Sequence, residues 1–296
     1  MALPWGGTVP LGHSLVQFEG LHVSLWPGER EEGEILVIID SPAEYFEVGR
    51  LAKRRDKLKE TQKLVLSSSL VGIEGDARLL FDGVSMVVHD GTIVVESRPF
   101  NLWDRVIVNY YCVAGGPQAA ASLDTVELLD APAAWLLEYM RRSSIYYLFL
   151  ALSGGLDSGC VALIVYRLCQ MLVEQPNDVL TSWYGIDKTI SAQALCNKIF
   201  LTCYLPNENY SSQKGQERSV SLAAAIGARH VIIPIGELTV KAMEPLTDVP
   251  SLAEQNLQAR LRMVMSYLLA QSSGPMLVLS AANASEKYSP HRIFIV

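Results

Sequence analysis

Basic residues are scarce in this sequence. Its 296 residues include 24 Lys and Arg against 31 Asp and Glu, which gives a net charge of −7 at pH 7. The one dense basic run is Lys53-Arg54-Arg55, and we interpret it as a solvated helix face. Because nucleic-acid binding needs a basic surface that neutralises phosphates, we expect no nucleic-acid partner.

Long apolar runs and secretion signals are also missing. No apolar run reaches membrane-spanning length, and the N-terminus lacks a basic start followed by an apolar core. We therefore expect no membrane partner and a cytoplasmic location. The cysteines lack metal-ligand spacing, and we interpret them as reduced, packed thiols of a cytosolic protein. There are five: Cys112, Cys160, Cys169, Cys196 and Cys203.

The most informative stretch runs from Leu150 to Cys160 and reads Leu-Ala-Leu-Ser-Gly-Gly-Leu-Asp-Ser-Gly-Cys. The apolar run 145–152 predicts a buried parallel strand, and apolar residues at helical spacing predict a helix over 157–173. A strand, a glycine turn and a helix N-terminus form an anion site, because backbone N–H groups and the helix dipole converge there. The alternative is an ordinary turn capped by Asp157 or Ser158.

The glycine turn differs from the two common phosphate loops. It lacks the Lys-Ser/Thr ending of a Walker loop and the third glycine of a dinucleotide fingerprint. Ser-Gly-Gly-x-Asp-Ser instead resembles the pyrophosphate loop of the N-type ATP pyrophosphatases. That superfamily includes NAD, GMP, asparagine and argininosuccinate synthetases.

Beyond the turn, predicted helices and strands alternate. The helices are 191–198, 212–226 and 257–270, and the strands are 199–205, 230–235 and 276–279. Such alternation predicts an α/β fold with a doubly wound parallel sheet. Ligands of these sheets bind at the carboxyl ends of the strands. The loops 206–209 and 280–286 should therefore converge with the glycine turn.

Three ordered motifs within 131–286 narrow the resemblance to the glutamine-dependent NAD synthetases. Residues 202–209, followed by Ser211-Ser212, resemble that family's second strand and loop. Glu254–Met263 matches its Asn-x-Gln-Ala-Arg-x-Arg-Met helix, and Leu277–Glu286 matches its Leu-Val-Leu-Gly-x-Ala-Asn-x-x-Glu strand and loop. The resemblance implies that 131–296 forms an adenine nucleotide alpha hydrolase-like domain, a C-terminally incomplete ATP-pyrophosphatase domain.

The resemblance also implies a reaction and its residues. ATP and Mg²⁺ would convert deamido-NAD to an acyl adenylate, releasing pyrophosphate, and ammonia would then displace AMP to give NAD. Ser153 and Asp157 would be catalytic, Asp157 and Glu286 would bind Mg²⁺, and Arg260 would bind the dinucleotide. Alternatively, Arg260 pairs with Glu254 or Glu237 and Glu286 is a surface residue. The pyrophosphate would contact Ala151, Leu152, Ser153, Gly154, Gly155, Leu156, Asp157 and Ser158.

The sequence pattern of residues 1–114 predicts several strands and one helix. The strands are 34–40, 84–88, 92–95 and 106–113, and the helix is 43–64. Asp90-Gly91 between apolar runs predicts a hairpin. Gly75–Gly83 and Glu96–Phe100 resemble the end of the carbon–nitrogen hydrolase (nitrilase-like) domain fused upstream in these synthetases, while Thr8–Gly12 and Leu25-Trp26 resemble the stretch around its catalytic cysteine. We expect a partial glutaminase-like segment over 1–114 and a linker over 115–130.

Residues 1–111 contain no cysteine. The resemblance places His22 where that family has its nucleophile, so glutamine hydrolysis is not expected of this chain, and both ends look truncated. Two other functions stay open: an inactive nucleotide-binding fragment or paralogue, and another ATP-pyrophosphatase-type amidotransferase. The partners expected are deamido-NAD, ATP, ammonia or glutamine, and further copies of this chain or other synthetase subunits.

Overall fold

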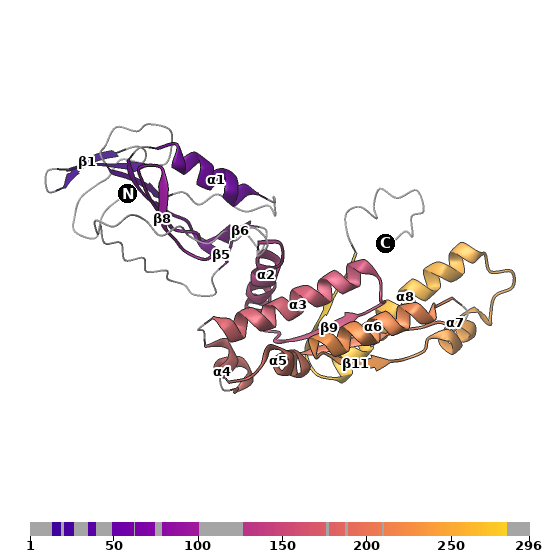
Figure 1. The fold of residues 1–296 in the computed structure, drawn as a ribbon. Coiled ribbons are helices and arrows are strands. Elements are labelled where there is room, and N and C mark those ends of the chain that lie inside the picture. The colour runs from indigo at the N-terminus through magenta and orange to yellow at the C-terminus, as the bar shows by residue number, and fades with distance from the viewer. Residues whose placement is uncertain are drawn as a thin grey trace. The chain divides into compact units, whose positions relative to one another are not determined.

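The chain divides into two compact units, Met1–Glu138 and Tyr139–Val296, which we describe separately (Figure 1). The structure is a computed structural model. It describes residues 14–18, 21–26, 35–39, 49–61, 63–74, 79–100, 127–175, 178–186, 189–208 and 210–282. The expected strand 106–113 and most of the expected linker lie outside these residues, so the division into 1–114, 115–130 and 131–296 stays a prediction.

The first unit is built on a six-stranded sheet with the order β1-β2-β3-β4-β7-β8. Strands β2, β3 and β4 are parallel, and the other pairs are antiparallel. Helix α1 contacts β8, and β5 and β6 form a separate antiparallel pair. The elements are β1 (Ser14–Phe18), β2 (Leu21–Trp26), β3 (Ile35–Ile39), α1 (Arg50–Lys59), β4 (Leu64–Ser68), β5 (Val71–Glu74), β6 (Leu79–Asp82), β7 (Met86–His89) and β8 (Thr92–Glu96).

The hairpin predicted at Asp90-Gly91 is confirmed. Both residues join β7 to β8 with positive φ, 47° and 70°, the conformation that a tight hairpin turn needs. The core beneath the sheet combines residues of α1 with alternate residues of β3, β4 and β7. Its buried members are Leu36, Leu51, Leu58, Val65, Val84, Met86, Val88 and Ile93.

The interpretation of Lys53-Arg54-Arg55 as a solvated face is wrong for both arginines. Arg55 is buried, and its Nε donates to Glu96 Oε1 at 2.8 Å. The Nη1 atom of Arg54 lies 3.6 Å from Asp82 Oδ1. Lys53 alone is exposed. Arg54 and Arg55 therefore join α1 to β6 of the separate strand pair and to β8 of the six-stranded sheet, which lie far along the chain.

We expect Glu96→Gln to destabilise the first unit by about 3 kcal/mol, because removing one partner leaves the buried Arg55 charge uncompensated. Hydrogen exchange of the β8 amides at neutral pH measures this loss. Lys59→Gln is the matched control, since Lys59 pairs with Asp56 at 3.7 Å on the exposed surface of α1, where ion pairs contribute little. Equal exchange in the Glu96 variant and the control would contradict the prediction.

The second unit contains a four-stranded parallel sheet with the order β11-β10-β9-β12, which confirms the predicted fold class. The strands are β9 (Tyr147–Ala151), β10 (Phe200–Tyr204), β11 (Arg229–Ile232) and β12 (Met276–Leu279). From β9 the chain moves outward through β10 to β11 and then returns to β12 on the other side of β9. The carboxyl end of β9 is therefore at the point where the strand order reverses, which is where such sheets bind ligands.

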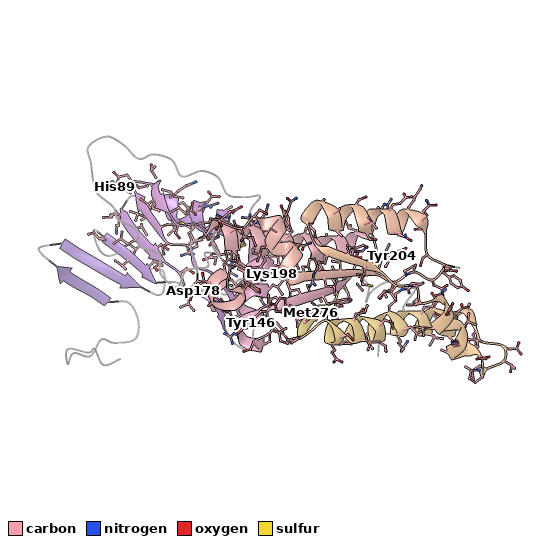
Figure 2. The ribbon with its side chains drawn as sticks, turned by 90° about the horizontal axis from the view of Figure 1, so that it is seen from below. His89, Tyr146, Asp178, Lys198, Tyr204 and Met276 are labelled. Carbon is pink, nitrogen blue, oxygen red and sulfur yellow. The ribbon has the colours of Figure 1, made fainter. Side chains whose placement is uncertain are left out.

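Helices cover both faces of this sheet. Helices α3 and α6 contact each other and the strands β9 and β10, whereas α8 contacts β9 and β12; Figure 2 shows the sheet between α6 and the yellow α8. Phe149, Leu201 and Cys203 form a core with Ala270 on the α8 side. The helices of this unit are α3 (Leu156–Glu174), α4 (Val179–Tyr184), α5 (Ala192–Ile199), α6 (Gln213–Ile226), α7 (Gly236–Met243) and α8 (Ser251–Ser272), while α2 (Glu127–Ser143) contains residues of both units.

Several elements differ from their predicted bounds. Helix α2 begins at Glu127, within the expected linker, and contains Pro132. The short helices α4 and α7 were not predicted. Strand β11 ends at Ile232, although Ile235 N still donates to Pro206 O at 2.8 Å. The chain thus follows β10 beyond the regular strand.

Helix α3 is mostly apolar in sequence, and its packing is that of a core helix. Its 19 residues are long and apolar enough to cross a membrane by length and composition, contrary to the expectation from the sequence. It packs against β9, α5 and α6, and Ala162, Val165 and Leu168 are fully buried. The cysteine prediction holds for Cys169, Cys196 and Cys203, which are buried, but not for Cys160, which is exposed; Cys112 lies outside the described residues.

His230 is a half-buried histidine on β11, opposite Thr202 of β10. The Thr202 hydroxyl donates to Arg229 O at 3.0 Å and accepts from His230 Nδ1 at 2.8 Å. His230 Nε2 is buried without a hydrogen-bond partner. Burial lowers the pKa of His230 below its ordinary value of 6.5.

We expect the second unit to lose stability as the pH falls below about 6.5. The unfolded chain binds a proton on His230 more readily than the folded chain does. The contribution of neutral His230 to the free energy of unfolding is therefore complete above the pKa of the unfolded chain and declines below it. Urea unfolding at a series of pH values measures this slope. His230→Asn, which keeps a donor near the Nδ1 position, should flatten it. An unchanged slope in the variant would show that other groups carry the pH dependence.

Candidate functional site

The glycine turn after β9 is packed tightly against the first turn of α6. Gly154 has φ +75°, and a Cβ atom there would lie 2.1 Å from Gly215 O. Gly155 follows as the extended N-cap of α3. Since an L side chain is strained at this φ and would overlap Gly215, position 154 requires glycine.

Two serine hydroxyls hold the turn in place. Ser158 is buried, and its hydroxyl donates to Gly155 O at 3.2 Å. Ser153 Oγ lies 2.9 Å from Ser158 Oγ and accepts from Gly155 N at 3.2 Å. The N-cap is Gly155, which has no side chain, so neither Asp157 nor Ser158 is the cap that the alternative expected; anion binding at the turn stays a prediction. The first N–H groups of α3, which lack intrahelical acceptors, remain suited to an anion.

A cavity of about 300 Å³ adjoins this turn at the carboxyl ends of β9 and β10. Arg262 reaches it from α8, and its Nε donates to Leu205 O at 3.1 Å. Burial lowers the pKa of Arg262 from its ordinary value. The described residues that line it include no carboxylate; they are Ala151, Leu152, Ser153, Cys203, Tyr204, Leu205, Ser211, Ser212, Gly215 and Arg262.

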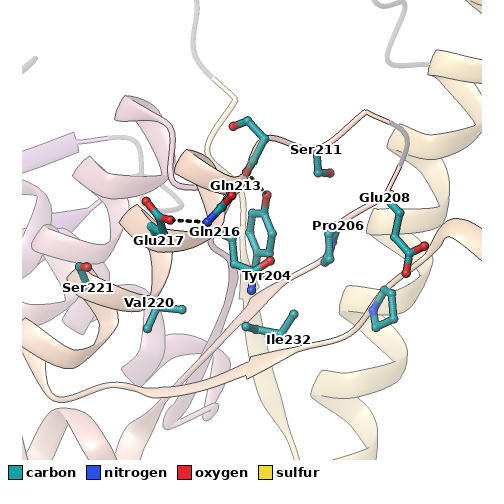
Figure 3. Close-up of a pocket in the computed structure, with 12 residues that line it drawn as sticks. Tyr204, Pro206, Glu208, Ser211, Gln213, Gln216, Glu217, Val220, Ser221 and Ile232 are labelled. Carbon is teal, nitrogen blue, oxygen red and sulfur yellow. Dashed lines mark hydrogen bonds between the residues drawn. The ribbon is translucent and has the colours of Figure 1, made fainter.

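A second, wider cavity of about 820 Å³ shares Tyr204, Ser211 and Ser212 with the first (Figure 3). Its polar wall comes from α6, where Gln213 Nε2 donates to Glu217 Oε1 at 2.9 Å. The floor is apolar and contains Ile232. A ligand with an apolar body and a polar end fits such a lining.

The structure brings most of the predicted site residues together. Ala151, Leu152 and Ser153 line the smaller cavity. Gly154, Gly155, Leu156, Asp157 and Ser158 form the turn and the first turn of α3, with Leu156 and Asp157 exposed.

Arg260 and Glu286 are placed differently. Arg260 is exposed and donates to Asn256 O at 3.2 Å, and it lines neither of the two cavities. Glu286 lies outside the described residues, as does part of each expected loop at 206–209 and 280–286. Within the described part of the chain, no group of three or more His, Cys, Asp or Glu side chains could hold a metal.

Seven residues that line the smaller cavity were not predicted as site residues: Cys203, Tyr204, Leu205, Ser211, Ser212, Gly215 and Arg262. Ser211 and Ser212 lie in a quoted motif, and Arg262 lies two residues after Arg260 in the Gln-Ala-Arg helix, so a signal was present for all three. Gly215 carried no such signal, because its role depends on the approach of Gly154.

Residues 128–290 match the model of the NAD synthase family. The glutamine-dependent NAD(+) synthetase of Saccharomyces cerevisiae is 29% identical over 84% of this chain and 47% of its own length. The Bos taurus synthetase is 30% identical over 75% of this chain and 42% of its own length. The chain therefore spans less than half the length of these curated relatives.

Two solved structures share the fold at low identity. A glutamine-dependent NAD(+) synthetase from Cytophaga hutchinsonii has a TM-score of 0.75 and 21% identity, covering 94% of this chain and 51% of that one. The Acinetobacter baumannii synthetase, solved with adenosine diphosphate, has a TM-score of 0.67 and 20% identity, covering 95% and 52%.

Proposed function

Because the chain belongs to the NAD synthase family, we propose that its second unit uses ATP to amidate deamido-NAD to NAD. A carboxylate oxygen of the pyridine ring attacks the α-phosphorus of ATP, and the bond to pyrophosphate breaks. Ammonia then attacks the acyl carbon, AMP leaves with the electrons of the acyl–oxygen bond, and the nitrogen loses its proton to solvent. The products are NAD, AMP and pyrophosphate.

The observation that carries this proposal is the glycine turn at the carboxyl end of β9. Ser153, Gly154, Gly155 and Ser158 would hold the pyrophosphate, because their backbone is fixed before any ligand arrives. Preorganised donors stabilise developing phosphate charge without reorganising during the reaction. The adjoining cavities supply space for the rest of a nucleotide.

Asp157 suits a Mg²⁺ ion shared with the nucleotide. Its carboxylate is exposed beside the turn, and protein-bound Mg²⁺ commonly takes one or two carboxylates together with substrate phosphates. When bound, the ion would neutralise phosphate charge. Glu286 stays the proposed second carboxylate and Arg260 the proposed contact with the dinucleotide. Association with further copies of the chain or with other synthetase subunits, and the cytoplasmic location, likewise stay predictions.

The test is pyrophosphate release by the 296-residue chain given ATP, Mg²⁺, deamido-NAD and ammonium. We expect release that depends on deamido-NAD and falls on the order of 100-fold in Asp157→Ala, with a loss also in Ser153→Ala. If the unaltered chain released pyrophosphate no faster than Asp157→Ala, the proposed activity would be contradicted. If ATP still bound under those conditions, the chain would be an inactive nucleotide-binding module. Faster turnover with xanthosine monophosphate or aspartate would instead favour another amidotransferase of this superfamily.

A further inference from the structure

Arg262 is a half-buried cation without a carboxylate partner. Its Nε–H donates to Leu205 O, and no ion pair of Arg262 exists among the residues that the structure describes. Guanidinium groups carry five N–H donors, so this single bond anchors the side chain and leaves the Nη edge for other acceptors.

An anionic ligand would compensate this half-buried charge. A charge removed from water is destabilising unless an opposite charge or hydrogen bonds compensate it. The lowered pKa of Arg262 has desolvation as its main cause. Since none of the described residues that line the smaller cavity is acidic, a ligand can supply the counter-charge.

Two serine hydroxyl groups that line the same cavity as Arg262 can also donate hydrogen bonds. Ser211 Oγ accepts from Asn207 N at 2.9 Å, and Ser212 Oγ accepts from Gly215 N at 3.1 Å. Each hydroxyl thus uses a lone pair on the backbone and keeps its own hydrogen for donation. Together with Arg262, these two donors line one cavity next to the glycine turn.

We propose that Arg262 is the fixed counter-ion for a phosphate group of the bound nucleotide, with Ser211 and Ser212 as accompanying donors. This inference rests on the proposed function, because it takes ATP as the ligand of the cavity. It separates two arginines of α8 that lie only two residues apart. Arg262 contacts the phosphate inside the cavity, whereas Arg260 is exposed and lines neither of the two cavities.

The experiment compares equilibrium binding of ATP, inorganic pyrophosphate, adenosine and deamido-NAD to the full chain. We expect Arg262→Gln to weaken the binding of ATP and of pyrophosphate about 10- to 100-fold, the range for hydrogen bonds to charged groups. The affinity for adenosine should stay unchanged. The ATP affinity of Arg262→Lys should lie between those of the unaltered chain and Arg262→Gln, since an ammonium group keeps the charge but lacks the planar arrangement of donors. The salt dependence of ATP affinity should also become shallower in Arg262→Gln. Arg218→Gln, an exposed arginine on α6, is the control and should bind as the unaltered chain does.

Each alternative outcome has a distinct meaning. Undiminished ATP affinity in Arg262→Gln would overturn this inference and leave the proposed function intact. So would equal losses for adenosine and ATP, which would show that Arg262 only supports the backbone at Leu205. A loss confined to deamido-NAD would assign the anion to the other substrate and also overturn it. An unaltered chain that bound neither ATP nor pyrophosphate would overturn the inference and the proposed function together. Thermal unfolding of the lysine variant identifies any loss that reflects misfolding.

Discussion

Gly154→Ala is expected to reduce ATP affinity and pyrophosphate release on the order of 100-fold or more. The residue has φ +75°, where a side chain costs about 1–3 kcal/mol. The added Cβ would also lie 2.1 Å from Gly215 O, a backbone atom. Either the turn or the first turn of α6 must move, and both belong to the site that we propose for the phosphates.

The control for this prediction lies five residues along the same segment. A Cβ at Gly159 would meet only Leu222 Cδ2, at 3.6 Å, which is an ordinary contact. Alanine also has a higher helix propensity than glycine, so Gly159→Ala should preserve binding and raise stability slightly. Titration of ATP and an assay of pyrophosphate release compare the two variants. If Gly154→Ala bound ATP like Gly159→Ala, the turn would not be the nucleotide site.

Glutamine is not expected to replace ammonia as the nitrogen source for this chain. Hydrolysis of an amide side chain by covalent catalysis needs an activated nucleophile, and residues 1–111 contain no cysteine. The position that resembles the nucleophile holds His22, which lies in β2 and pairs with Gln17 of β1. With glutamine alone, we expect neither glutamate nor NAD above background.

The measurement supplies glutamine, ATP, Mg²⁺ and deamido-NAD while an enzymatic scavenger removes contaminating ammonia. Glutamate and NAD are then followed together, and a parallel reaction with ammonium chloride and no scavenger is the positive control. Glutamate formed in proportion to NAD would contradict the prediction. In that case His22→Ala is the first variant to test.

Local sequence was sufficient for the features that depend on neighbouring residues. Residues 145–158 identified a strand, a glycine turn and a helix N-terminus, and the hydrogen bonds between Ser153 and Ser158 lie within that segment. Asp90-Gly91 identified its hairpin for the same reason. The alternation of apolar helices and strands also predicted the parallel sheet, because sequential crossovers leave few arrangements.

Tertiary structure decided the features that depend on residues distant along the chain. Arg54 and Arg55 were taken for surface residues, because nothing near them indicated that Asp82 and Glu96 would pair with them. The need for glycine at 154 likewise depends on α6 approaching the turn at Gly215.

For the two arginines of α8, the sequence determined one part of the site and the tertiary structure decided the other. The sequence by itself determined a helix with Arg260 and Arg262 in a family motif, but it did not determine which arginine reaches the cavity. Residues two apart on a helix differ by about 200° in direction, so only one of them can face the sheet. The packing of α8 on β9 and β12 turns Arg262 toward Leu205 and leaves Arg260 exposed. Helix rotation is set by burial against distant strands, and a short motif carries no information about it.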